Sequence, residues 1–108
     1  MADKPITPAV HVLADMLSYQ ESAVVSRILL KNRGGSVTLF AFGEGEELSE
    51  HTTPFDALVI AIDGEAAITV AGETYTVRAG DTITMPATQP HALRALSDFK
   101  MLLIMLKG

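Results

Sequence analysis

Two segments decide the fold: GEELSEHTTPFDALVIAIDG at residues 45–64 and GDTITMPATQPHALRA at residues 80–95. Each begins with a glycine, and each contains one histidine, His51 in the first and His91 in the second. The first segment closes with a continuous apolar run, LVIAI at residues 58–62, which stops at Asp63-Gly64. This dipeptide is typical of tight hairpin turns. The sequence therefore predicts a β-hairpin here, with a histidine-bearing segment on either side of it.

Short strands separated by turns are predicted from residue 24 to the end of the chain. The turns are rich in glycine and lie at residues 32–35, 43–45, 63–64, 71–73 and 79–81. The strands are predicted at residues 24–31, 36–42, 58–62, 66–70, 74–78, 82–85, 91–96 and 99–106. Glu44, Glu46 and Glu47 are expected on a solvated loop. About nine short strands of this kind are typical of a β-sandwich or a closed barrel, so the expected fold class is all-β.

The first 21 residues are predicted to form an arm that precedes a barrel at residues 22–108. Thr7 followed by Pro8 is a helix-start signal, because the hydroxyl can cap and proline needs no N–H partner there. Val10, Leu13 and Leu17 then follow at helical spacing. One short amphipathic helix is therefore predicted over residues 8–17.

The composition excludes several classes of function. Among 108 residues, 48% are apolar and the net charge is −5, with eight Lys and Arg that form no cluster. Such a chain has no basic surface for nucleic acid to bind by itself. The absence of cysteine excludes disulfides and thiolate metal sites. The longest apolar run, residues 101–106, is too short to span a membrane, so a cytoplasmic protein is expected.

Two of the predicted strands are apolar on both faces. Residues 58–62 and 101–106 show no alternation of apolar and polar side chains. One face of each strand must pack inside the barrel, and the other needs a cover. A single short helix is too small to cover both strands, which indicates a homodimer.

The two segments resemble the pair of motifs that define the cupin superfamily. In the first, Gly45, His51 and Gly64 keep the motif spacing, and in the second Gly80 and His91 do so together with Pro86. The resemblance covers roughly residues 22–107. It implies a double-stranded β-helix, the RmlC-like jelly-roll barrel, with a small-molecule site inside it.

The metal-ligand positions of that motif are only half retained. Metal-binding cupins use two histidines and a glutamate from the first motif and a third histidine from the second. His51 and His91 match two of these positions, while Thr53 stands at the second histidine and Ala57 at the glutamate. Asp56 is a nearby carboxylate, but a shift of one residue turns it to the other face unless the strand bulges. The resemblance therefore implies weak binding, at most, of a divalent metal such as Zn, Ni, Fe or Mn.

A ligand pocket is predicted around the motif positions. Its residues are His51, Thr53, Phe55, Ala57, Met85 and His91. The alternative for the histidines is a pair of neutral rings kept by ordinary hydrogen bonds, and for Phe55 and Met85 it is core packing. The predicted function is binding of a neutral or weakly acidic small molecule.

Two other functions stay open at this stage. The first is a metal-dependent enzyme, dioxygenase- or isomerase-like, in which Asp56 or water completes the shell of His51 and His91. The second is the ligand-sensing module of a regulatory system. No catalytic residue is assigned, because no nucleophile and base are recognisable together.

Overall fold

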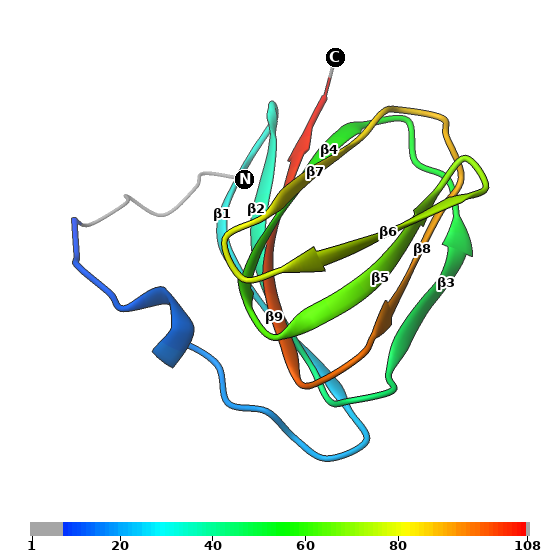
Figure 1. Ribbon diagram of the computed structural model, residues 1–108. Helices are drawn as coiled ribbons and strands as arrows, with labels where there is room; N and C mark the ends of the chain where they lie inside the picture. Colours follow the sequence, from blue (N-terminus) through cyan, green and yellow to red (C-terminus); the bar gives the residue numbers. More distant parts are fainter. Residues whose placement is uncertain (1–7, 108) are drawn as a thin grey trace.

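The computed structural model describes residues 8–107 and shows two antiparallel sheets that face each other (Figure 1). Within these residues the chain forms nine strands and one 3-10 helix, η1. Their bounds are η1 Leu13–Asp15, β1 Val24–Asn32, β2 Gly35–Phe42, β3 Glu47–His51, β4 Asp56–Asp63, β5 Glu65–Val70, β6 Glu73–Arg78, β7 Thr82–Met85, β8 His91–Ala95 and β9 Phe99–Leu106. The five-stranded sheet has the order β1-β2-β9-β4-β7, and the four-stranded sheet has the order β3-β8-β5-β6. The all-β jelly-roll prediction is confirmed, although in this part of the chain neither sheet closes on itself.

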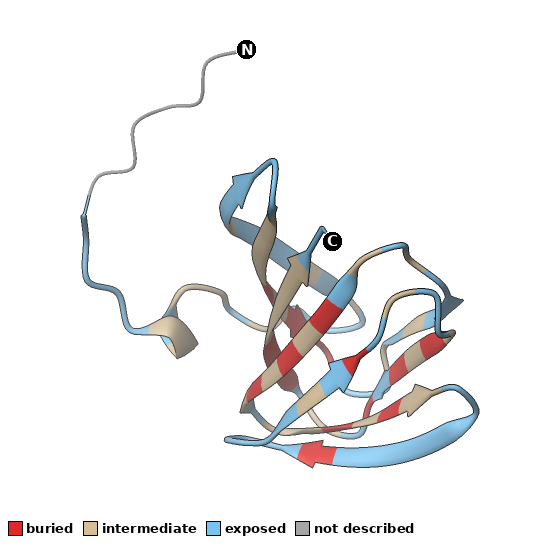
Figure 2. Cartoon of the chain, turned by 90° about the horizontal axis from the view of Figure 1, so that it is seen from above, coloured by how far each residue is buried: buried red, intermediate tan, exposed pale blue. Residues whose placement is uncertain are grey.

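The core lies between the two sheets. Along β4, Ala57, Val59 and Ala61 are buried while the residues between them are half-buried, as the two-residue period of a strand requires. Figure 2 shows the same alternation on the neighbouring strands. Phe42 and Phe99 are fully buried, with ring centroids 6.1 Å apart. Each such side chain contributes about 1.5–3 kcal/mol of burial free energy.

The outer face of the five-stranded sheet is also apolar. Leu58 lies opposite Ile104, and Ile60 lies opposite Leu102, as cross-strand pairs of β4 and β9. All four side chains are half-buried. The continuous apolar runs in the sequence therefore reflect strands with an apolar side chain on both faces.

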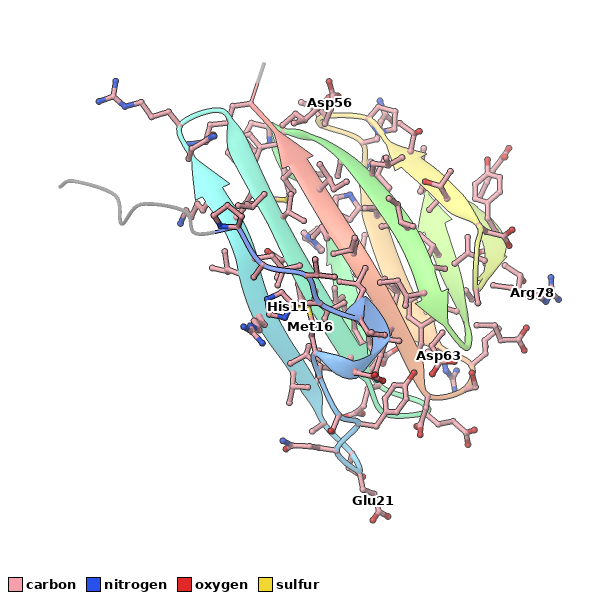
Figure 3. The ribbon with its side chains drawn as sticks, turned by 90° about the vertical axis from the view of Figure 1, so that its left-hand side faces the viewer. His11, Met16, Glu21, Asp56, Asp63 and Arg78 are labelled. Carbon is pink, nitrogen blue, oxygen red and sulfur yellow. The ribbon has the colours of Figure 1, made fainter. Side chains whose placement is uncertain are left out.

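The N-terminal segment lies across this outer face (Figure 3). Lys100 on β9 is only 8% exposed, and its Nζ donates a 2.6 Å hydrogen bond to the carbonyl of Ala14. The same Nζ lies 4.6 Å from the centroid of the Tyr19 ring. The Tyr19 hydroxyl donates to Asp63, and burial together with that carboxylate raises the tyrosine pKa. The segment is thus fastened to the sheet by polar contacts.

The helix predicted over residues 8–17 is wrong: the chain forms a single 3-10 turn, Leu13–Asp15. Of the expected apolar stripe, Leu13 and Leu17 are half-buried, whereas Val10 is 99% exposed and packs against nothing. Helices of fewer than about 12–15 residues are marginal without such packing. The capping Thr7 lies outside the described residues. No helix in residues 8–107 is long and apolar enough to cross a membrane.

Strand β3 is the other difference from the prediction. Glu47, expected on a loop, begins this strand, which forms one edge of the four-stranded sheet. Three of its five residues, Glu47, Ser49 and Glu50, are polar and exposed. The strand therefore lacks the β-branched and aromatic residues that usually indicate a strand in the sequence.

Candidate functional site

His51 and His91 are brought together by the pairing of β3 with β8, in which they are direct cross-strand partners. On β8 the side chains alternate, and His91 is buried on the same face as Leu93. On β3, His51 and Leu48 line the same cavity although they are three residues apart. An odd spacing normally places two side chains on opposite faces, but the register shifts between Leu48 and His51. This bulge aims His51 at His91.

Both imidazole rings are held by backbone carbonyls two residues upstream. His51 Nδ1 lies 2.7 Å from the oxygen of Ser49, and His91 Nδ1 lies 3.2 Å from that of Gln89. A carbonyl oxygen can only accept a hydrogen bond, so Nδ1 carries the proton in each ring. The two Nε2 atoms lie 3.1 Å apart, and the rings meet edge to face with centroids 4.3 Å apart. In neutral rings, each Nε2 therefore directs its lone pair at the other.

The surroundings favour the neutral form of His91. The side chain is 8% exposed, and burial lowers its pKa, with a smaller contribution in the same direction from His51. The Gln89 carbonyl opposes this shift in part. Two lone pairs 3.1 Å apart repel each other. A hydrogen-bond donor or a cation between the rings would turn that repulsion into attraction.

A cavity of about 40 Å³ lies beside the histidine pair. Its lining residues are Leu48, His51, Val59, Ile68, Met85, His91, Ala92, Leu93, Met101 and Leu103. The two imidazoles are its titratable groups, and the rest of the wall is apolar. His91 is buried while His51 is exposed, so the pair spans the distance from solvent to the interior. The volume accommodates a small group rather than a whole metabolite-sized molecule.

The family follows from the sequence match and agrees with this geometry. The profile of the cupin domain matches residues 38–107, more than half of the chain. The chain belongs to the cupin family. An uncharacterized protein of Streptomyces coelicolor is 33% identical to this cupin over 76 residues, which cover 69% of this chain and 72% of the relative.

Two solved structures resemble this cupin over most of its length. A conserved protein of unknown function from Streptococcus pyogenes is 38% identical, with a TM-score of 0.88 and coverage of 93% of this chain and 88% of that one. A cupin superfamily protein from Desulfitobacterium hafniense is 32% identical, with a TM-score of 0.86 and coverage of 89% and 88%. These similarities establish the family and the fold, and the chemistry of the site depends on its own residues.

Thr53 and Ala57 do not line the cavity of this cupin. Thr53 Oγ1 is engaged with the backbone of Phe55, donating to its carbonyl and accepting from its N–H at 3.1 and 3.2 Å. Ala57 is 5% exposed and packs in the core. Its cross-strand partners are Met85 on β7 and Met105 on β9. The position of the family's glutamate is thus occupied by a methyl group between two thioethers.

Asp56 and Phe55 lie apart from the histidine pair. The Asp56 carboxylate accepts a 2.8 Å hydrogen bond from the N–H of Ala87 and is exposed, so it fastens the loop that precedes β8. Phe55 is half-buried, and its ring lies 5.6 Å from Lys107 Nζ. Of the six predicted pocket residues, the structure brings together His51, His91 and Met85 in one cavity.

The side chains present do not fit the divalent metal of metal-binding cupins. Such an ion needs at least three protein ligands, commonly with a carboxylate among them. Within residues 8–107, no three His, Cys, Asp or Glu side chains are grouped so that they could hold a metal ion. The histidine pair offers two nitrogens, Thr53 uses its hydroxyl locally, and Ala57 offers no donor.

Sequence reasoning missed most of the apolar wall. Leu48 lies opposite the buried Leu93 on β8, but the polar residues around it in β3 give no strand signal in the sequence. Val59 and Ile68 are inward-facing residues of β4 and β5, and their alternation with Ala57 and Ala66 could have identified them. Strand periodicity identifies the inward face of each strand, but it does not show which residues of the two sheets lie opposite each other. The wall residues could therefore not be chosen from the sequence.

Proposed function

We propose that this protein binds a small, largely apolar ligand through one hydrogen-bond donor, which the Nε2 atoms of His51 and His91 accept. The convergence of the two Nε2 lone pairs supports this proposal, because both Nδ1 protons are already committed to carbonyls. A hydroxyl or ammonium proton is the complementary group. The apolar wall suits an alkyl group attached to it.

The small cavity sets the depth to which such a ligand enters. About 40 Å³ admits the donor group and a few carbons, and anything longer would extend outward past the exposed His51. A carboxylate is a poor match, because two neutral acceptors offer it no proton. The expected ligand class is therefore a primary alcohol or amine with a short alkyl chain.

A pair of probes that differ only in the donor tests this proposal. We expect 1-butanol to shift the Met85 ε-methyl resonance and the histidine Nε2 resonances of the intact chain, and butyl methyl ether to shift neither at the same concentration. The His51→Phe variant should lose the response to butanol. The His11→Phe variant is the matched control, because His11 lies on the N-terminal segment. An equal response to the ether, or a full response in His51→Phe, would refute donor recognition.

We also propose that the protein assembles as a homodimer through the outer face of the five-stranded sheet. The N-terminal segment lies on this face but leaves the apolar pairs of β4 and β9 partly exposed, and Leu106 is 58% exposed, which supports this proposal. A second copy would remove this apolar surface from water. Light scattering at micromolar concentration should give twice the mass of the chain, and Ile104→Lys should give the monomer mass. A monomeric wild type would refute this assembly but would not affect the proposal for the ligand site.

A further inference from the structure

Two methionines are the cross-strand partners of the residue at which metal-binding cupins have a carboxylate. The Ala57 methyl lies between the register partners Met85 and Met105. Met85 also lines the histidine cavity and is 6% exposed. Thioether sulfur is a soft donor, and together with imidazole it favours Cu(I) over hard or borderline divalent ions. The donors that remain therefore favour a different metal from the one the motif implies.

We propose that this site binds a single soft monovalent cation, Cu(I), through the Nε2 atoms of His51 and His91 and the sulfur of Met85. The proposal rests on the proposed function only in taking this cavity as the functional site. It involves coordination alone, with no change in oxidation state. Two neutral nitrogens and one neutral sulfur would give the ion three donors.

The geometry of the histidine pair is close to what a bridging cation needs. Both Nδ1 protons are fixed by carbonyls, as is typical of histidines that ligate metal, so both Nε2 atoms are free to coordinate. Metal–nitrogen bonds are about 2 Å, so two nitrogens on one three-coordinate ion lie roughly 3.5 Å apart, and the present 3.1 Å separation would have to widen by about 0.4 Å. The exposed ring of His51 can make that movement, while the buried ring of His91 stays in place.

The charge balance of the cavity also favours a monovalent ion. Neutral donors leave the charge of the ion uncompensated, and within residues 8–107 no grouped carboxylate is available to neutralise it. The Born cost of moving an ion into an apolar environment rises with the square of its charge, so a monovalent ion meets about a quarter of the divalent penalty. Zinc would therefore bind weakly at the same donors.

Met85, rather than Met101, lies at the histidine end of the cavity. Met85 pairs with Ala57, whereas Met101 pairs with Ala61, four residues further along β4. That separation corresponds to about 13 Å of strand. The loops that lead to the histidine end are joined there, because the N–H of Thr88 donates to a carbonyl of the loop after β3 at 2.8 Å. Met101 also lines the cavity, but its backbone is further from the loops that carry the histidine end.

Competition for Cu(I) tests the site in the intact chain. Without oxygen, the wild type should withdraw one equivalent of Cu(I) from its bicinchoninate complex, and equimolar Zn(II) should not displace it. Met85→Leu should weaken Cu(I) binding by about tenfold or more. Met101→Leu is the matched control, because the same swap in the same cavity should change the affinity by less than about twofold. Both swaps conserve volume, so folding should survive them.

Silver provides a second measurement that needs no variant. Ag(I), a redox-inert ion of the same charge, should shift the Met85 ε-methyl and both Nε2 resonances of the wild type but leave Met101 in place. The proposal is overturned if the wild type takes no Cu(I) from bicinchoninate, if Zn(II) binds as tightly, or if Met85 responds in neither measurement. An intact response to butanol in that case would show that ligand binding stands without the metal.

Discussion

Restoring the two missing ligands should create a divalent site and destabilise the metal-free protein. Ala57 is 5% exposed, and its register partners are Met85 and Met105. Ala57→Glu must therefore insert a methylene and a carboxylate into a filled space, and such overpacking costs about 1–3 kcal/mol. Burying the carboxyl group without a partner costs roughly 1–3 kcal/mol more. Thr53→His removes the hydroxyl that bonds the Phe55 backbone, at about 1 kcal/mol.

Together these contributions lower the unfolding free energy of the metal-free double variant by on the order of 5 kcal/mol, a large part of the usual 5–15 kcal/mol. Zinc at 100 times its dissociation constant should return about 2.7 kcal/mol, because it binds only the folded state. Thermal unfolding followed by circular dichroism, with and without Zn(II), measures both effects. The wild type should respond little to zinc.

Pairing Thr53→His with Ala57→Gln provides the matched control. It keeps the size of the new side chain but removes its charge, so most of the zinc response should disappear. If the Glu variant folds and zinc does not stabilise it, positions 53 and 57 are not directed at the histidine pair. If zinc stabilises the wild type equally, the count of ligands in the native site is wrong.

Three further perturbations test the fold and the electrostatics. Lys100→Met removes the hydrogen bond that holds the N-terminal segment and the contact with Tyr19, and urea denaturation should show a loss of about 1–3 kcal/mol. Gly64→Ala should lose about 2 kcal/mol or more in thermal unfolding, because a Cβ there would lie 1.8 Å from a backbone oxygen at a φ of +75°. Gly72→Ala, with φ +85° and nothing within 4 Å, should lose only about 1 kcal/mol. Because burial holds the His91 pKa below 6.5, the unfolded chain binds more protons as the pH falls through that value. Wild-type stability should therefore decrease between about pH 7 and pH 5 more steeply than that of His91→Phe, as measured by chemical denaturation.

The strands were predictable where glycine-containing turns separate them. Gly64, Gly72 and Gly80 all have positive φ values, so the residue type itself indicates the end of a strand. The strands that follow these glycines, β5, β6 and β7, lie within about a residue of their predicted bounds. Local sequence was sufficient there because backbone conformation and side-chain identity are directly coupled.

The N-terminal helix and β3 were not predictable in this way. The helical spacing of Val10 and Leu13 is a local signal, but a short helix needs a tertiary partner for its apolar side, and Val10 has none. In β3 the strand exists because β8 pairs with it, although its own residues are polar. In both segments tertiary contacts override the local pattern.

In the candidate site, too, local sequence determined some features and tertiary contacts determined others. The motif positions of His51 and His91 identified the pair, but the bulge that turns His51 inward depends on β3–β8 pairing. Thr53 matches a ligand position in the sequence, yet its hydroxyl bonds the adjacent backbone. Position along the motif predicted which residues lie near the site, and local hydrogen bonding determined which of them are free to act.

The composition of the site avoids an unpaired buried charge. A buried glutamate at position 57 would be costly whenever no cation neutralised it, whereas Ala57 between Met85 and Met105 packs without charge. The histidine pair is what this apolar replacement leaves behind, with each Nδ1 hydrogen-bonded and each Nε2 facing the other. Such a site is tolerable when empty, because its donors are neutral. Because two lone pairs converge on one point, the partners we propose for it are a proton donor or a soft cation. The donors at positions 51 and 91 suit such partners better than a hard divalent ion.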